Sequence, residues 1–257
     1  MQSTGETPGA PGIPRARLIP RRAPLPAHTL AGLERELKFI VPDSRVAFVG
    51  AWLRSVCAPD PAYPPARVVT VYFDTARLDL LDEKINSDYL KTKVRVRWYE
   101  ALEGSPAGDA LFVEAKLRVG STRQKVRTPA EAPAADAARW TLGRREWSAL
   151  LEPLRLEGVE LPQDLLPVMR LSYVRERLVD RAGGGRVTLD SRMAIDAVNP
   201  QRMRPGLTGR MPGAVVEYKG HTPELPAHLR LLTTSGGRKA SFSKYLAGYI
   251  HATRTMF

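Results

Sequence analysis

This sequence has little cysteine, no long apolar run and fewer acidic than basic residues. The first two of these features each exclude a class of protein. The 257-residue chain has one cysteine, Cys57, which excludes an internal disulfide framework and a cysteine-rich zinc module. Its apolar runs fall well short of the roughly 18 residues that a membrane span needs. Acidic residues are outnumbered, with 27 Asp and Glu against 39 Lys and Arg. At 43% hydrophobic residues the chain can still bury a core, so wholesale disorder is excluded.

The excess of positive charge belongs mainly to the body of the chain. Residues 1–28 are rich in proline and carry four arginines against one glutamate, so they account for +3 of the formal net charge of +12. We expect a disordered tail over 1–28 and one folded domain over 29–257. Of the 39 basic residues 30 are arginine, whose guanidinium group contacts two phosphate oxygens at once. This composition indicates a polyanionic partner, although biased genome composition would also produce an arginine-rich chain.

The spacing of apolar residues predicts a chain built mostly of strands. Runs rich in β-branched and aromatic residues, or alternating between polar and apolar, predict eight strands over 33–41, 68–75, 91–100, 110–119, 122–128, 169–180, 185–196 and 213–219. Helical spacing predicts helices over 43–57, 144–156 and 241–254. The expected fold class is therefore α+β and mainly antiparallel β, a sheet or barrel with helices packed outside.

Residues that share one face of a strand carry the functional signal. In the segment 91–100, Lys93, Arg95 and Arg97 share one face and apolar residues share the other. Taken singly, each strand fits an ordinary sheet with its charged face in water. Several faces that carry almost only Arg and Lys would repel one another, so together they favour a closed sheet around a polyanion. The few carboxylates on these faces would hold a divalent cation that bridges phosphate oxygens; they are Glu34, Glu36, Glu114 and Glu217.

Short motifs along the chain resemble, in order, those of a known family. They are Glu34-Arg-Glu-Leu-Lys38, Val71-Tyr-Phe-Asp-Thr75, Val94-Arg-Val-Arg-Trp-Tyr99, Val113-Glu-Ala-Lys116, Tyr173-Val-Arg175, Arg186-Val-Thr-Leu-Asp190, Val216-Glu-Tyr-Lys219 and Phe242-Ser-Lys-Tyr245. From about residue 33 to 250 the chain resembles the VTC domain, the polyphosphate polymerase branch of the triphosphate tunnel metalloenzymes, or CYTH-like superfamily.

This resemblance implies a fold, an activity and a set of site residues. The implied fold is an eight-stranded triphosphate-tunnel barrel with a charged interior, and the implied activity transfers the γ-phosphate of ATP to inorganic polyphosphate. Catalysis would fall to Arg95, Arg97, Lys116, Arg175 and Arg186. Substrate binding would fall to Lys38, Lys93, Lys125, Tyr173, Lys219 and Lys244. Mn²⁺ or Mg²⁺ would bind at Glu217, with Glu34 and Glu36 assisting.

Two other functions fit the same sequence. A triphosphatase would use the same tunnel, with a water positioned by Glu34 or Glu36. A non-catalytic module would bind polyphosphate or nucleic acid. Trp98 lies on the strand face opposite Arg95 and Arg97, so aromatic residues interleave little with the basic ones, and no nucleic-acid partner is expected. We expect a cytoplasmic protein with no membrane segment in this chain; the sequence identifies no membrane or regulatory partner.

Overall fold

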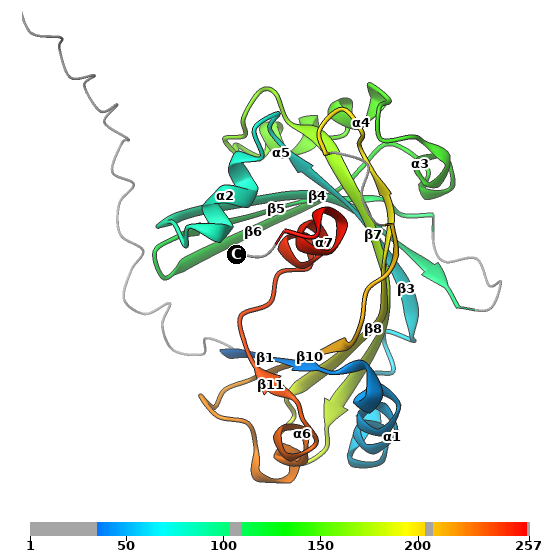
Figure 1. Ribbon diagram of the computed structural model, residues 1–257, viewed down its shortest axis with the longest axis vertical. Helices are drawn as coiled ribbons and strands as arrows, with labels where there is room; N and C mark the ends of the chain where they lie inside the picture. The colour runs from blue at the N-terminus through cyan, green and yellow to red at the C-terminus, as the bar shows by residue number, and fades with distance from the viewer. Residues whose placement is uncertain (1–34, 103–108, 204–207, 256–257) are drawn as a thin grey trace, which may run out of the picture. The chain divides into compact units, whose positions relative to one another are not determined.

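The main element of the fold is a strongly curved antiparallel sheet. The computed structural model describes residues 35–102, 109–203 and 208–255, and within them eleven strands form one sheet (Figure 1). The tail predicted over 1–28 and the carboxylate of Glu34 lie outside the described residues.

Eight long strands overlap the eight that the sequence predicts. They are β1 (Arg35–Val41), β3 (Ala66–Asp74), β4 (Leu90–Ala101), β5 (Phe112–Val119), β6 (Thr122–Pro129), β7 (Leu166–Asp180), β8 (Arg186–Val198) and β10 (Ala214–Gly220). Three short strands complete the sheet: β2 (Cys57–Pro59), β9 (Gly209–Arg210) and β11 (Arg238–Lys239). The strand order is β11-β1-β10-β8-β7-β3-β4-β5-β6, with β2 on β7 and β9 on β8. Every pairing is antiparallel, so the predicted α+β, mainly antiparallel class is confirmed.

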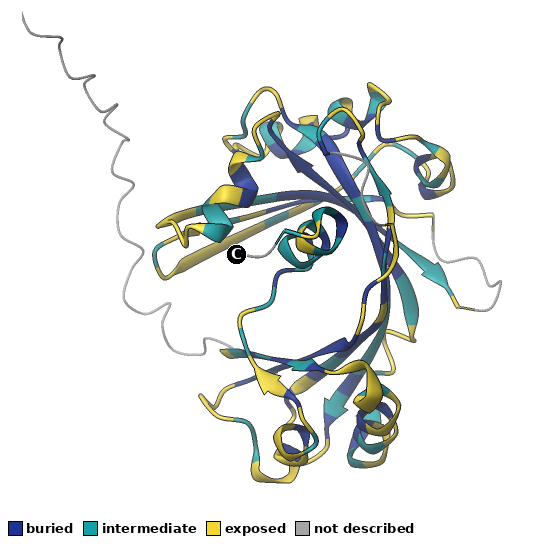
Figure 2. Ribbon diagram, viewed as in Figure 1, coloured by how far each residue is buried: buried dark blue, intermediate teal, exposed yellow. Residues whose placement is uncertain are grey.

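The predicted closure of the sheet into a barrel is wrong for the described residues. Their strand pairing starts at β11 and ends at β6, and no ladder joins these two edges. The sheet curls from β6 through β7 and β8 to β1 and leaves one concave face (Figure 1). β6 is exposed along most of its length (Figure 2) and carries Arg123, Lys125 and Arg127. A basic edge strand of this kind disfavours further strand pairing.

The convex face is apolar and covered by helices, as predicted. Side chains of β3, β4 and β5 pack against α3 (Ala134–Arg139), α4 (Glu146–Ala149) and α5 (Glu152–Leu156). Side chains of β1, β8 and β10 pack against α1 (Val46–Val56) and α6 (Leu231–Thr234). Burial of these apolar side chains supplies the main driving force for folding and leaves the alternate, charged positions on the concave face.

One helix lies on the opposite side from the predicted position. The segment 241–254 was expected to cover the outside, but α7 (Lys244–Thr253) packs on the concave face, inside the curve of the sheet (Figure 1). Its Tyr245 stacks on Tyr72 of β3 with ring centroids 5.0 Å apart. A Cβ at Gly248 would come within 2.8 Å of the Met169 sulfur, so glycine permits this close approach.

Other helix boundaries also differ from the prediction. The single helix predicted over 144–156 is two short helices, α4 and α5, because Pro153 in the first turn of α5 cannot continue a preceding helix. Helix α2 (Asp79–Ile85) was not predicted. Buried Asp74 accepts hydrogen bonds from the Leu80 and Leu81 amides of α2 and, at 2.8 Å, from the Tyr245 hydroxyl. Asp74 thereby ties β3 to both α2 and α7.

Candidate functional site

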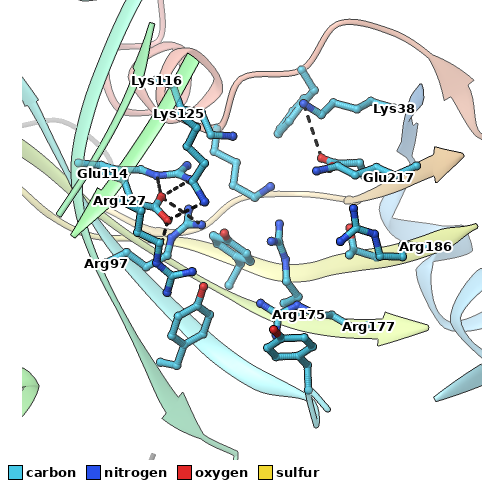
Figure 3. Close-up of a pocket in the computed structure, with 18 of the residues that line it drawn as sticks. Lys38, Arg97, Glu114, Lys116, Lys125, Arg127, Arg175, Arg177, Arg186 and Glu217 are labelled. Atoms are coloured by element: carbon cyan, nitrogen blue, oxygen red, sulfur yellow. Dashed lines mark hydrogen bonds and ion pairs between the residues drawn. The ribbon is translucent and has the colours of Figure 1, made fainter. Parts of the chain in front are cut away.

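A cavity of about 560 Å³ lies on the concave face and is lined mainly by cations. Among the described residues its lining has three carboxylates, Asp60, Glu114 and Glu217, against twelve basic side chains. The basic side chains are Lys38, Lys93, Arg95, Arg97, Lys116, Lys125, Arg127, Arg175, Arg177, Arg186, Lys219 and Lys244. Those labelled in Figure 3 reach into a common space from strands on both sides of it. So many like charges in one concave space attract a polyanion.

The structure brings together nearly all the predicted site residues. The eleven basic and tyrosine residues proposed for catalysis or substrate binding all line the cavity, as do Glu114 and Glu217. Glu36 lies at its border, where it forms ion pairs with Lys38 and Lys219. Glu34 lies outside the described residues.

Several lining residues were missed at the sequence level. Arg127 and Arg177 follow Lys125 and Arg175 at a spacing of two, so strand alternation alone would have found them. Tyr63 precedes β3 in a proline-rich loop and offered no comparable signal.

Glu114 is the common counter-ion of four basic side chains. Its carboxylate accepts a hydrogen bond from Arg95 Nε at 2.6 Å and lies 3.3 Å from Lys125 Nζ. Arg127 Nε and an Arg97 terminal nitrogen lie 3.5 and 3.9 Å away. Burial favours the neutral acid, but Arg95, Arg97 and Lys125 outweigh it and lower the pKa of Glu114 to about 2. Glu114 is therefore ionised at neutral pH and holds this group of cations in place.

Asp190 is likewise a shared counter-ion of basic side chains, on the opposite side of the cavity. It is buried and accepts two hydrogen bonds from Arg175, Nε to Oδ1 at 2.6 Å and Nη2 to Oδ2 at 2.7 Å. Lys244, the first residue of α7, donates to Oδ2 at 2.5 Å. Burial opposes ionisation, but Arg175 and Lys244 prevail and hold the pKa of Asp190 well below its usual range. The carboxylate thus positions one cation from β7 and one from α7 at the same wall.

Two carboxylates and two lysines alternate across β1 and β10. Lys38 pairs in register with Glu217, and Glu36 with Lys219. Lys219 Nζ lies 3.1 Å from Glu217 and 3.5 Å from Glu36, and Lys38 contacts both carboxylates. Burial raises the pKa of Glu36, but Lys38 and Lys219 outweigh burial and bring it down to about 2.

The predicted metal ligands divide into two kinds. Mg²⁺ and Mn²⁺ prefer oxygen ligands and often bind through one or two carboxylates plus substrate phosphates. Glu36 and Glu217 fit this pattern, because they are partly exposed neighbours at the border of the cavity. Glu114 does not, because four basic side chains surround both of its oxygens. No group of three Asp, Glu, His or Cys side chains suited to a metal occurs within the described ranges, so substrate oxygens would complete the site.

Two lysines of the cavity have strongly lowered pKa values. Removal from bulk water inside the cavity and then Arg95 lower the pKa of Lys116 to about 7, with Lys219 adding to the effect and Glu36 opposing it, although part of the Lys116 side chain is exposed to solvent. Burial, Arg95 and Lys116 hold the pKa of Lys93 well below its usual range. Lys93 donates to the Ser243 hydroxyl at 2.9 Å. The protein alone therefore disfavours full protonation of this wall.

We predict that tripolyphosphate binding draws protons from solution. Negative charge in the cavity raises the pKa of Lys116 from about 7, so above that pH the lysine takes up a proton when the ligand binds, and affinity falls as pH rises. At pH values near 8 the uptake is on the order of one proton. Titration calorimetry in two buffers of different ionisation enthalpy measures it. Lys116→Arg, which stays charged, should still bind with reduced uptake; equal heats in both buffers would contradict the prediction.

One end of the cavity is aromatic. Along β4 the inward side chains run from Lys93 through Arg97 to Tyr99, so lysines and aromatics occupy opposite ends. At the aromatic end Arg127 lies over the Phe112 ring at 3.7 Å, and Arg177 lies over the Tyr63 ring at 4.5 Å. Flat rings interleaved with guanidinium groups provide a surface on which a nucleobase stacks.

These features define the class: an antiparallel-sheet protein whose concave face carries a strongly basic cavity. Residues 33–252 match the family model described as the VTC domain, and the chain belongs to that family. The resemblance inferred from the motifs is thereby confirmed. A comparison with curated proteins found no match.

The comparison with solved structures found distant neighbours, two of which are bacterial. A "putative adenylate cyclase" from Bacillus halodurans is 14% identical, with a TM-score of 0.48, and the match covers 82% of this chain and 94% of that one. A "putative adenylate cyclase" from Vibrio parahaemolyticus is 12% identical, with a TM-score of 0.43, covering 83% and 96%.

Within the described ranges, no helix is both long enough and apolar enough to cross a membrane.

Proposed function

We propose that this protein is a metal-dependent polyphosphate polymerase that uses ATP as its phosphate donor. The observation that carries the proposal is the cavity, where twelve basic side chains face three carboxylates among the described residues. Phosphoryl transfer needs positioning of the reacting groups and neutralisation of their charge, and a ring of Arg and Lys supplies both. Membership of the VTC family supports the same substrate class.

In the proposed step, a terminal oxygen of the polyphosphate chain attacks the γ-phosphorus of ATP. The new P–O bond lengthens the chain, the bond to the β–γ bridging oxygen breaks, and ADP leaves with the electron pair. Arg95, Arg97 and Arg175 neutralise the transferred group, and Lys116 and Lys244 steer the acceptor chain. A metal held by Glu36 and Glu217 supplies further neutralisation of phosphate charge when it is bound. The nucleophile is already an anion, so no strong general base is required.

Two observations favour this reaction over hydrolysis of inorganic tripolyphosphate. The aromatic end with Tyr63, Tyr99 and Phe112 suits a nucleoside, which tripolyphosphate lacks. Glu36, a carboxylate that a triphosphatase would use to activate water, has a pKa lowered to about 2. A general base works best when its pKa lies near the working pH, so Glu36 is poorly suited to that role.

The test is incubation of the purified protein with ATP and Mn²⁺ or Mg²⁺. We expect ADP release together with polyphosphate that can be sized on a gel. If neither ADP nor polyphosphate is formed, the proposal is overturned and a binding module remains. Orthophosphate release from tripolyphosphate, without ATP-dependent chain growth, would identify a triphosphatase instead.

Glu217→Gln is predicted to separate metal use from polyanion binding. Losing this ligand should lower polymer synthesis about 10- to 100-fold at limiting metal, with partial recovery at high metal concentration. Binding of tripolyphosphate without metal should hold or tighten, because Lys38 and Lys219 lose a competing carboxylate. Rates over a metal titration check the prediction, with the exposed Glu224→Gln as control. A metal response identical to that of the parent protein would argue against Glu217 as a ligand.

A further inference from the structure

The basic surface continues past the cavity along three strands. On β4, β5 and β6 the concave-face residues lie opposite one another in rows, and successive rows are two residues apart. Arg95, Glu114 and Arg127 form one row, and Lys93, Lys116 and Lys125 form the next. Lys91, Arg118 and Arg123 form a further row, about 7 Å along the strands. This last row, here called the outer row, does not line the cavity.

The outer row has no internal charge compensation. Like charges directly opposite on neighbouring strands destabilise a sheet, yet this row and the one before it are basic at all six positions. Within the described residues, no ion pair joins a carboxylate to Lys91, Arg118 or Arg123, and Arg118 Nε donates instead to the Gly120 carbonyl at 2.6 Å. By contrast, the row around Glu114 contains its own counter-ion. The uncompensated charge is what an anionic ligand would neutralise.

A helix brings a further cation to the same place. Lys84 of α2 hydrogen-bonds the Ser241 hydroxyl at 3.1 Å. The Thr92 amide of β4 donates to the Glu83 carboxylate of α2 at 2.6 Å, which places Lys84 near Lys91. Burial lowers the pKa of Lys84, and the charges of Lys91, Lys38 and Arg118 lower it further. Positive charge thus extends from the lysine end of the cavity onto the outer row, away from the aromatic end.

We propose that the outer row, with Lys84 beside it, is an exit site that binds a polyphosphate chain after it leaves the cavity. This inference rests on the proposed function and deepens it, because it names long-chain polyphosphate as the ligand and gives the chain a direction. The nucleoside lies at the aromatic end, and the growing chain leaves over β4–β6. The exposed Tyr89 ring at this edge packs on Gly120, so the outer row lacks the array of free rings that nucleic acid binding uses.

Binding experiments without ATP test this exit site. The variant Lys91→Gln/Arg118→Gln/Arg123→Gln should bind long-chain polyphosphate about tenfold more weakly and with a smaller salt dependence. Its affinity for tripolyphosphate, which fits inside the cavity, should change less than about twofold. The control Arg139→Gln/Arg145→Gln/Arg230→Gln removes the same charge from exposed positions on the convex side and should bind both ligands like the parent.

Three outcomes would overturn the exit site: equal weakening for both chain lengths, equal weakening in the control variant, or no weakening in a folded outer-row variant. Tighter binding of a single-stranded oligonucleotide than of polyphosphate, lost in the outer-row variant, would replace it with a nucleic-acid site. Because binding is measured without ATP, failure of polymerase activity alone leaves these results intact. Thermal melting of each variant verifies that it is folded.

Discussion

Replacing Glu114 with glutamine should lower the free energy of unfolding by about 3–5 kcal/mol, which corresponds to roughly 6–20 °C in Tm. The substitution keeps the shape but removes the one negative charge shared by Arg95, Arg97, Lys125 and Arg127. Arg95 and Arg97 are nearly buried, so water hydrates them poorly once the charge of Glu114 is lost, whereas Lys125 and Arg127 are partly exposed. Thermal unfolding measures the effect. Tripolyphosphate should then raise the Tm of the variant more than that of the parent, because it restores a counter-ion.

Acid titration gives an independent check on Glu114. Its pKa is about 2 in the folded protein against an ordinary value of 4.5. A lowered pKa stabilises the fold above the ordinary value, and this contribution, about 3 kcal/mol, is lost as pH falls from about 4.5 toward 2. The variant should lack this part of the acid dependence. Glu152→Gln, which breaks an exposed ion pair with Arg155, is the matched control and should cost less than about 1 kcal/mol. Similar losses of Tm in Glu114→Gln and Glu152→Gln would refute the role of Glu114 as the shared counter-ion of the four cations.

Strand alternation explains why so much of the site could be predicted from the sequence. A period of two assigns each residue of a strand to one face, whichever strands are its neighbours. Lys93, Arg95 and Arg97 could therefore be grouped without any knowledge of strand order. The same reasoning extended by one step would have included Arg127 and Arg177.

Long-range pairing and docking could not be obtained in the same way. Whether the sheet closes depends on whether its two edge strands meet, and no local pattern in β6 or β11 encodes that distance. An amphipathic pattern in 244–253 predicts a helix with one apolar side, but not which sheet face it covers. Likewise, the charge of Glu114 suggests a metal ligand until its four basic neighbours are seen.

The position of α7 gives Asp190 a larger role than its sequence motif suggests. Because α7 enters the concave face, its first residue, Lys244, reaches the same carboxylate that orients Arg175 of β7. Lys244 also lies 4.5 Å from the centre of the Tyr173 ring, and the Tyr173 hydroxyl, though buried, has no hydrogen-bond partner among the described residues. Asp190 therefore orients Arg175 and Lys244, which line the cavity, although Asp190 itself does not line it.

Asp190→Asn should lower the kcat of ATP-dependent polymer synthesis about 100-fold, because displacing well-oriented groups by about 1 Å costs a factor of this size. The KM for ATP should not rise, since loss of the Asp190 carboxylate makes the net charge around the cavity more positive by one. Initial rates of ADP release over an ATP titration measure both constants. Asp180→Asn is the matched control: Asp180 is equally buried, but its partner is His228, outside the cavity. That variant should lose stability and keep its kcat. If both variants lose stability and kcat alike, Asp190 serves the fold alone and does not position Arg175 and Lys244 for the reaction.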